Sequence, residues 1–372
     1  MHKGLIDNPP PGYEFVTDKS PQENIFKSAS RFGISYLLAH GIDKVIPINL
    51  TKSRMERFRK IPRDTDLLYS CGHLVFRKVP WVVDLEYLSL LVSYNVGHFN
   101  RYRKVMQTAL ASEYCRKIIC WTEAGKKTVL LNLDGTKLEP KLVTAYQSVN
   151  RRNFTKNAGS AKVKLLFIGS DNILGEFEIK GGREVLEAFT LLRQKYPNLE
   201  LMIRSDVPRD IKERYSGYDN IRIIEERIPR ERLDHEFKIA DIFLLPAHNT
   251  PFLVFMEAMS YELPVVTIDA WANSEIVENG RTGLLVPSSE KIPYYYGECF
   301  MPDFGTPPFN KAIKNPDPKV VKGLVEKTSI LIENAELRQQ MGRAGRREIE
   351  IGKFSIDKRN EKLKRIFDEA TA

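Results

Sequence analysis

Glu257 is the residue whose type and position most clearly suggest chemistry. It lies in a segment, residues 241–286, that alternates strand, loop and helix in quick succession. The predicted helix 252–261 follows Thr250 and Pro251, which suit cap and first-turn positions. Unpaired N–H groups in that first turn favour an anion such as a diphosphate, so Phe252 and Leu253 are binding candidates, together with Pro251 at the start of the helix. Because a carboxylate repels phosphate, we expect Glu257 to bind a pair of hydroxyl groups.

The elements around this helix predict a parallel sheet. Three apolar runs, residues 241–246, 263–269 and 283–287, are too short for helices and rich in Val, Leu and Ile. Such runs are typical of strands that are buried on both faces. Open parallel sheets bind ligands at the carboxyl ends of their strands, which is where the helix 252–261 would begin. The same alternation starts earlier, with a strand, an amphipathic helix and a strand at 162–170, 181–196 and 199–204.

Residues 252–287, FLVFMEAMSYELPVVTIDAWANSEIVENGRTGLLVP, resemble the donor-site segment of retaining GT-B glycosyltransferases of the family-four, or group 1, type. Glu257 matches the family glutamate that binds the ribose of a nucleotide sugar. Asn249 stands eight positions earlier, where the family has a glutamate that contacts the transferred sugar. The resemblance therefore implies that Asn249 binds the sugar hydroxyls.

Two further donor-side positions follow from the resemblance. In the family, an arginine after the first strand of the donor domain and a lysine before the next helix grip the diphosphate. Lys180 matches the lysine, whereas Ser170 stands where the arginine would be. Lys180 and the first turn of helix 252–261 would stabilise the charge on the leaving diphosphate. The family binds the nucleotide base near a turn that corresponds to Ile228.

The first half of the chain offers two weaker matches. Gly12 stands near the place of the family's glycine-rich first loop, although a plain Pro/Gly turn explains NPPPGY nearly as well. Glu86 falls where many family members have a histidine that faces the sugar and the acceptor. It is the acceptor-side candidate, and a loop-capping role is the alternative.

The chain length of 372 residues fits two domains, and the strand–helix–strand order predicts an α/β fold. The resemblance implies a GT-B architecture, with two Rossmann-like domains whose parallel sheets face a cleft. We expect residues 1–155 to form the acceptor-side domain and residues 156–354 to form the donor-binding domain. Residues 355–372 would form a helix that returns to the first domain. In the first domain, the predicted elements are strand 3–7, helix 23–39 and strands 44–50, 67–70 and 81–84.

The net charge of the chain is +9, and the excess of basic over acidic residues lies in the first half of the chain. Residues 51–63 combine Arg and Lys with Met55, Phe58 and Ile61, a pattern that suits either an anionic membrane surface or a solvated helix face. No motif for nucleic-acid recognition accompanies the charge, so no nucleic acid is expected as a partner.

Composition and cysteine spacing restrict the protein class. No apolar run reaches the roughly 18 to 20 residues of a spanning helix, and the N-terminus has no secretory signal, so a cytoplasmic protein is expected, with peripheral contact at the inner membrane face as an option. The four cysteines have no metal-ligand spacing. Asp64 and Asp66 resemble a metal-binding Asp-x-Asp, but they precede a strand, where Asp is ordinary turn chemistry.

The predicted activity is the transfer of a sugar, with retention and without a metal or cofactor, from a nucleotide-diphosphate sugar. UDP- or GDP-sugars are the expected donors, and a glycan or a lipid-linked hydroxyl is the expected acceptor. Because Asn249 and Ser170 depart from the family pattern, the alternative is a non-catalytic GT-B-like partner subunit or sugar-nucleotide-binding protein. The proline-rich stretch 288–318 interrupts the resemblance and has no assigned role.

Overall fold

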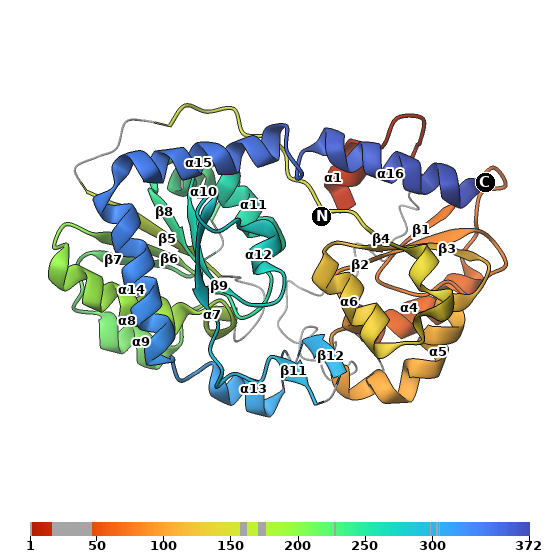
Figure 1. The fold of residues 1–372 in the computed structure, drawn as a ribbon, viewed down its shortest axis with the longest axis horizontal. Helices are drawn as coiled ribbons and strands as arrows, with labels where there is room; N and C mark the ends of the chain where they lie inside the picture. Colours follow the sequence, from red (N-terminus) through yellow and green to blue (C-terminus); the bar gives the residue numbers. More distant parts are fainter. Residues whose placement is uncertain are drawn as a thin grey trace. The chain divides into compact units, whose positions relative to one another are not determined.

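The computed structural model describes residues 2–16, 47–156, 162–169, 176–226, 228–297, 299–302, 304 and 306–372. The chain forms two compact α/β units, each with its own parallel sheet (Figure 1). The first unit combines Met1–Tyr146, Tyr295–Asp303 and Arg359–Ala372, and the second combines Gln147–Tyr294 and Phe304–Lys358. Both predicted Rossmann-like domains are therefore α/β units with parallel strands.

The sheet of the first unit has four parallel strands in the order β1-β2-β3-β4 within the described residues. They are β1 (Leu68–Cys71), β2 (Trp81–Leu85), β3 (Cys115–Cys120) and β4 (Leu142–Thr144). Alternation along the central strands sends side chains to two cores, because successive residues of a strand point to opposite faces. On one face Trp81 and Val83 pack with residues of α5 (Phe99–Ala111) and α6 (Glu123–Asn132).

The opposite face is covered by α1 (His2–Asp7) and the C-terminal helix α16 (Ile356–Thr371). Val82 and Ile119 meet an apolar stripe of α16 whose spacing is that of a helix face: Leu363, Ile366, Phe367 and Ala370. The prediction that the C-terminal helix returns to the first domain is confirmed.

Short elements complete the first unit. They are α4 (Ile48–Met55) and the 3₁₀ turns η1 (Glu56–Phe58), η2 (Leu88–Val92), η3 (Val96–His98), η4 (Gly135–Lys137) and η5 (Glu139–Lys141). A hairpin of β11 (Tyr295–Tyr296) and β12 (Cys299–Pro302) also belongs to it. Asn132 Nδ2 donates to the Phe300 carbonyl oxygen at 2.9 Å, and Met301 is buried in the core. The 288–318 stretch thus leaves the second unit, adds a hairpin to the first, and returns.

The described residues of the second unit form a six-stranded parallel sheet in the order β10-β9-β8-β5-β6-β7. The strands are β5 (Lys164–Ile168), β6 (Glu200–Arg204), β7 (Ile221–Ile224), β8 (Ile242–Leu244), β9 (Val265–Asp269) and β10 (Gly283–Pro287). The order runs outward from β5 in one direction and from β8 in the other, as in a doubly wound fold. The predicted strands at 241–246, 263–269 and 283–287 correspond to β8, β9 and β10.

The helices of the second unit lie around this sheet (Figure 1). They are α7 (Glu176–Ile179), α8 (Gly182–Lys195), α9 (Arg209–Tyr215), α10 (Arg230–Ile239), α11 (Phe252–Ser260), α12 (Asn273–Ile276), α13 (Pro307–Ala312), α14 (Pro318–Glu333) and α15 (Ala335–Glu350). The predicted helix 252–261 is α11.

Two predictions for the start of the chain are wrong. Residues 3–7 form helix α1 instead of a strand, and Leu5 of that segment contributes to a core. The strand predicted to end at residue 50 is also wrong, because α4 begins at Ile48 directly after Pro47. Proline has the backbone angle that suits a helix start and lacks the N–H that a strand would use. The predicted helix 23–39 lies outside the described residues.

Burial protects two of the four thiols from reaction. Loss of hydration raises the pKa of Cys115 to about 12, and burial also raises the pKa of Cys120. Because the thiolate is the reactive form, we expect these two to react with Ellman's reagent at pH 8 at least about 100-fold more slowly in the folded protein than in guanidinium chloride. More than two fast-reacting thiols in the folded protein would contradict this burial. Cys299, which is partly exposed, is the internal reference.

Candidate functional site

The candidate site is built at the carboxyl edge of the second sheet, where β5 and β8 are neighbours and the order of strands reverses. After β8, the chain runs through Asn249 to Pro251 and enters α11. No side chain caps the first turn of α11, since Pro251 occupies the N-cap position. Pro251 and Phe252 are buried, whereas Leu253 is 37% exposed. The predicted N-terminus is therefore present, and within it the Phe252 N–H donates to the Thr250 carbonyl oxygen at 2.9 Å.

Lys180 and Asn249 lie in direct contact, although 69 residues separate them. Lys180 Nζ donates to Asn249 Oδ1 at 3.0 Å and lies 3.4 Å from Glu176 Oε2. Gly181 permits this approach, because it has a φ of +79° and a Cβ there would come within 2.4 Å of the Pro246 carbonyl oxygen. The turn before α8 is thus packed tightly on the loop after β8, and this packing brings together two of the predicted site residues.

Glu257 does not stand free at the site. Its Oε1 accepts from Arg152 Nη2 at 3.1 Å and from Arg230 Nη2. Arg230 also pairs with Asp234 through a 2.6 Å contact between Nε and Oδ1. The guanidinium of Arg152 lies 5.6 Å from the centre of the Tyr261 ring. Two arginines therefore neutralise the carboxylate that was predicted to bind hydroxyl groups.

Neither arginine is apparent from local sequence patterns. Arg152 lies in the segment after β4, and Arg346 of α15 holds that segment in place. Arg346 donates to the carbonyl oxygens of Arg152 and Phe154, both at 3.2 Å, and pairs with Glu262 at 2.9 Å. The sequence feature that could have pointed to Arg152 is the pair of adjacent arginines at 151–152, in the link between the two units.

The remaining donor-side predictions have separate outcomes. Ile228 is buried and lies two residues before Arg230, whose guanidinium reaches Glu257. The turn that contains Ile228 therefore lies beside Glu257 and the two arginines that contact it. Ser170 lies outside the described residues.

In the first unit, Glu86 follows β2 and accepts a hydrogen bond from the Tyr94 hydroxyl. Burial and the charge of Glu86 raise the pKa of Tyr94 well above its usual value, so this hydroxyl keeps its proton. Ser93 and Tyr94 have φ angles of 55° and 61°, a conformation that costs non-glycine residues of order 1 kcal/mol each. Asn49 supports the strained turn, since its Nδ2 donates to the Leu90 carbonyl oxygen at 2.6 Å.

Gly12 lies in a turn of the first unit in which the Tyr13 N–H donates to the Pro10 carbonyl oxygen at 3.1 Å. Its φ is +86°, which glycine adopts without strain. The turn follows a helix instead of the predicted strand.

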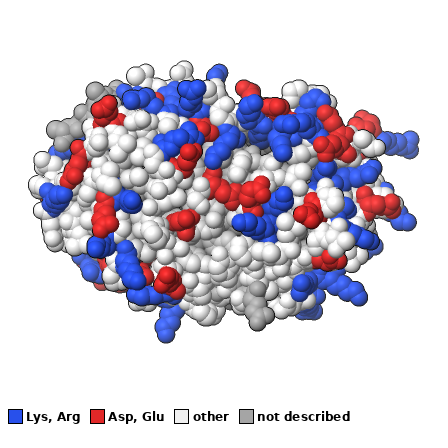
Figure 2. Space-filling view, viewed as in Figure 1, with Lys and Arg blue, Asp and Glu red and all other residues white. Residues whose placement is uncertain are grey.

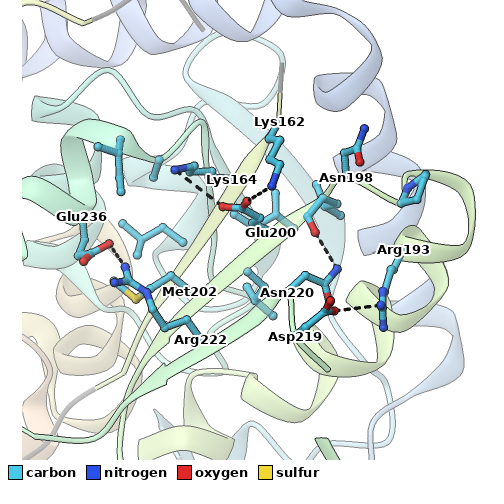
Figure 3. A pocket seen from close by; sticks show the side chains of 17 residues that line it. Lys162, Lys164, Arg193, Asn198, Glu200, Met202, Asp219, Asn220, Arg222 and Glu236 are labelled. Atoms are coloured by element: carbon cyan, nitrogen blue, oxygen red, sulfur yellow. Dashed lines mark hydrogen bonds and ion pairs between the residues drawn. The ribbon is translucent and has the colours of Figure 1, made fainter. Parts of the chain in front are cut away.

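A hollow of about 570 Å³ lies on a different part of the second unit (Figure 3). It is lined by residues at the starts of strands, including Lys164 of β5 and Glu200 of β6. The charged side chains in it pair with one another: Lys162 with Glu200 at 3.0 Å, Arg193 with Asp219 at 3.2 Å, and Arg222 with Glu236. None of the predicted site residues that the structure describes lines this hollow.

Within the described ranges, no cluster of three or more His, Cys, Asp or Glu side chains is arranged to hold a metal ion. In the same part of the chain, no helix has the length and apolar character needed to span a bilayer.

Residues 162–293 match the model of the family described as Glycosyl transferases group 1. Over 136 residues the chain is 29% identical to the D-inositol 3-phosphate glycosyltransferase of Arthrobacter sp. (strain FB24), a match that covers 34% of this chain and 31% of that protein. The matched region is thus about a third of the curated relative. Both matches support the group 1 glycosyltransferase family.

Solved structures share the fold over more of the chain. A mutant of S. aureus TarM, in complex with Fondaparinux, alpha-GlcNAc-glycerol and UDP, has a TM-score of 0.56 and 16% identity over 79% of this chain and 52% of that one. Anabaena Alr3699/HepE, in complex with UDP and glucose, has a TM-score of 0.54 and 15% identity over 78% and 72%. A glycosyltransferase from Rickettsia africae has a TM-score of 0.56 and 14% identity over 96% and 84%. At these identities the likeness establishes the fold: two parallel-sheet α/β domains of the GT-B class.

Proposed function

We propose that this protein is a glycosyltransferase that moves a sugar from a nucleotide-diphosphate sugar to an acceptor hydroxyl, with retention of anomeric configuration and without a metal. The observation that carries the proposal is the contact of Lys180 with Asn249 beside the uncapped first turn of α11. This contact lies in the segment that matches the group 1 glycosyltransferases. It places a cation and an amide beside the start of a helix, where open parallel sheets bind ligands.

In the proposed reaction the diphosphate gains negative charge as the glycosidic bond breaks. Lys180 and the N–H groups at the start of α11 stabilise that charge, which is electrostatic preorganisation. Asn249 Oδ1 already accepts from Lys180, so its Nδ2 is the group left to donate to a sugar oxygen. A glutamate at this position has no such donor, so the amide selects a different pattern of sugar hydroxyls.

The other predicted residues complete the proposed site. Glu257 binds the ribose hydroxyls and shares its oxygens with Arg152 and Arg230, while Ile228 lies beside the base. Glu86, held by Tyr94, acts on the acceptor side. A UDP-sugar is the proposed donor, because the TarM and Alr3699/HepE structures contain UDP. A glycan or lipid-linked hydroxyl is the proposed acceptor.

Nucleotide-sugar binding is tested by thermal shift of the purified protein with UDP-, GDP-, ADP- and dTDP-sugars, each with and without EDTA. A ligand that binds only the folded state raises the melting temperature, and we expect a UDP-sugar to do so equally in both buffers. Turnover with that donor, and NMR of the anomeric proton of the product, then test transfer and retention. Loss of the shift in EDTA contradicts metal independence. Binding without turnover, across glycan and lipid acceptors, favours a non-catalytic sugar-nucleotide-binding protein.

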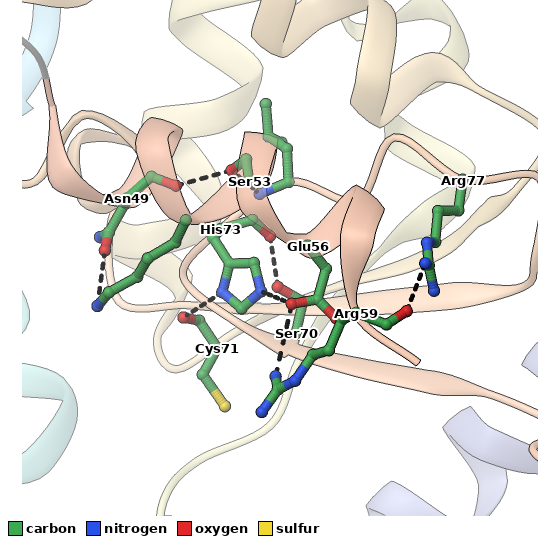
Figure 4. Close-up of polar contacts among 10 residues, drawn as sticks. Asn49, Ser53, Glu56, Arg59, Ser70, Cys71, His73 and Arg77 are labelled. Carbon is green, nitrogen blue, oxygen red and sulfur yellow. Dashed lines mark hydrogen bonds and ion pairs between the residues drawn. The ribbon is translucent and has the colours of Figure 1, made fainter. Parts of the chain in front are cut away.

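An anionic membrane surface is the proposed peripheral partner, which would place the protein at the inner face of a membrane. Phe58 is 87% exposed and Met55 is 52% exposed, within a run of basic residues. Figure 4 shows how this segment is held: Arg77 Nη2 donates to the Arg59 carbonyl oxygen, and Glu56 lies beside His73. Over the face drawn in Figure 2, Lys and Arg are interspersed with Asp and Glu, so the exposed aromatic ring marks the contact better than charge does.

Flotation with vesicles containing phosphatidylglycerol tests this surface. We expect Phe58→Ser to weaken vesicle binding by about tenfold, because the ring is the largest apolar group available for insertion. The matched control is Leu131→Ser, which removes an apolar side chain that is 62% exposed elsewhere in the same unit. Equal binding by both variants and the unaltered protein would remove the membrane from the proposal.

A further inference from the structure

Three polar side chains from separate segments form a connected network beside the Lys180–Asn249 pair. His248 is fully buried on the loop after β8, and its Nε2 lies 3.1 Å from Oε1 of Glu184 in the first turn of α8. Its Nδ1 lies 2.9 Å from the hydroxyl of Tyr294. Glu184 is 1% exposed, and its Oε2 has no hydrogen-bond partner among the described residues. Burial of such polar groups lowers the free energy of unfolding, which indicates that the network has a role beyond packing.

The contacts of the three groups fix the His248 ring. Burial, together with the charge of Glu184, raises the pKa of Tyr294, so its hydroxyl stays protonated. Nε2–H of the imidazole donates to Glu184 Oε1, and Nδ1 is engaged with the Tyr294 hydroxyl. Because both ring nitrogens have partners, the orientation of the ring is fixed.

The backbone of His248 connects this network to the proposed catalytic pair. The His248 N–H donates to the Ile179 carbonyl oxygen at 2.8 Å. The residues that follow these two partners in sequence are Asn249 and Lys180. Both the backbone and the ring of His248 make hydrogen bonds to neighbouring segments. The loop that carries Asn249 and the turn that carries Lys180 therefore have little freedom to separate.

Tyr294 gives the network a further connection. It is the last residue of the second unit before the chain enters the β11–β12 hairpin of the first unit. Its ring packs in a small cluster of the second unit with Ile292, Phe309 and Ile313. The proline-rich stretch 288–318 thereby supplies a hydrogen-bonding group directly behind the candidate site.

We propose that His248, Glu184 and Tyr294 are positioning residues, which hold the Lys180 ammonium and the Asn249 amide in their catalytic arrangement. This inference rests on the proposed glycosyl transfer and deepens it. The 288–318 stretch contributes to activity through Tyr294. Since a misplacement of about 1 Å lowers rates by up to about 100-fold, loss of the network lowers kcat while donor binding persists.

Kinetics of full-length variants test the inference. We expect Tyr294→Phe, which removes only the hydroxyl, and His248→Gln to lower kcat by about tenfold or more, with the Kd for the donor changed less than threefold. The double variant is expected to have the kcat of His248→Gln alone, because residues that act as one unit are not additive. All assays are run well below the melting temperature of each variant, so that loss of folded protein does not contribute.

Surface residues of the same types provide controls. His235→Gln changes an exposed histidine on α10, and Tyr196→Phe changes a tyrosine that binds Glu333 at the surface. Both should retain the kcat of the unaltered protein. Normal kcat in Tyr294→Phe, or a loss that appears equally in kcat and donor affinity, overturns the positioning role. An unaltered protein that neither binds nor uses any nucleotide sugar overturns the proposed function itself, and the inference falls with it.

Discussion

Lys180→Ala lowers kcat by about 100- to 1,000-fold and changes donor affinity much less. In the proposed reaction the ammonium group faces charge that develops on the diphosphate as the bond breaks, so its expected contribution is larger in the transition state than in the ground state. Lys180 is 9% exposed and is held by Asn249 and Glu176, so it does not need to be ordered when the donor binds. Steady-state kinetics and calorimetric titration of the nucleotide sugar separate the two effects.

Two variants accompany this measurement. Lys180→Arg keeps the charge but not the shape of the group, so we expect it to restore only part of kcat. Lys195→Ala, at the other end of α8, removes an exposed lysine that pairs with Glu333 at 2.6 Å, and it should behave as the unaltered protein does. Equal losses of kcat in Lys180→Ala and Lys195→Ala, or a loss confined to donor affinity, would contradict the assignment.

Glu257→Ala weakens binding of the nucleotide sugar by about 10- to 100-fold. Hydrogen bonds to a charged group contribute about 1.5–3 kcal/mol, and the variant removes the acceptor proposed for the ribose hydroxyls. The variant also leaves Arg152 and Arg230 without their shared carboxylate. Its affinity for inorganic diphosphate should therefore stay the same or rise, whereas its affinity for the nucleotide sugar should fall.

Deoxy analogues make this prediction specific to the ribose. The unaltered protein should bind UDP better than 2′,3′-dideoxy-UDP, and Glu257→Ala should bind the two alike. If Glu257→Ala still binds UDP better than the dideoxy analogue, another group binds the ribose hydroxyls. The control is Glu278→Ala, which removes a half-exposed carboxylate that pairs with Arg281 at 2.5 Å and should leave nucleotide binding unchanged.

The second unit was the more predictable part of the molecule from sequence. Its strands are short apolar runs with clear limits, and the start of α11 follows a proline, so local composition was sufficient to place both. The resemblance to GT-B glycosyltransferases implied that Lys180 and Asn249 belong to one donor site, and the two side chains are in contact. The start of the first unit lacked such signals, and the strand expected at residues 3–7 is a helix that contributes Leu5 to a core.

The sequence by itself determined the two-domain α/β class, the elements of the donor segment and the residue types that carry charge there. Only the tertiary structure decided which groups those residues meet. Arg152 is 105 residues from Glu257, and Tyr294 is 46 residues from His248. Periodicity and capping act over a few residues, whereas these contacts depend on how distant segments pack. Pairing of buried charges and hydrogen-bonding groups is therefore a property of the folded chain, and it gives the predicted site residues partners that no local pattern contains.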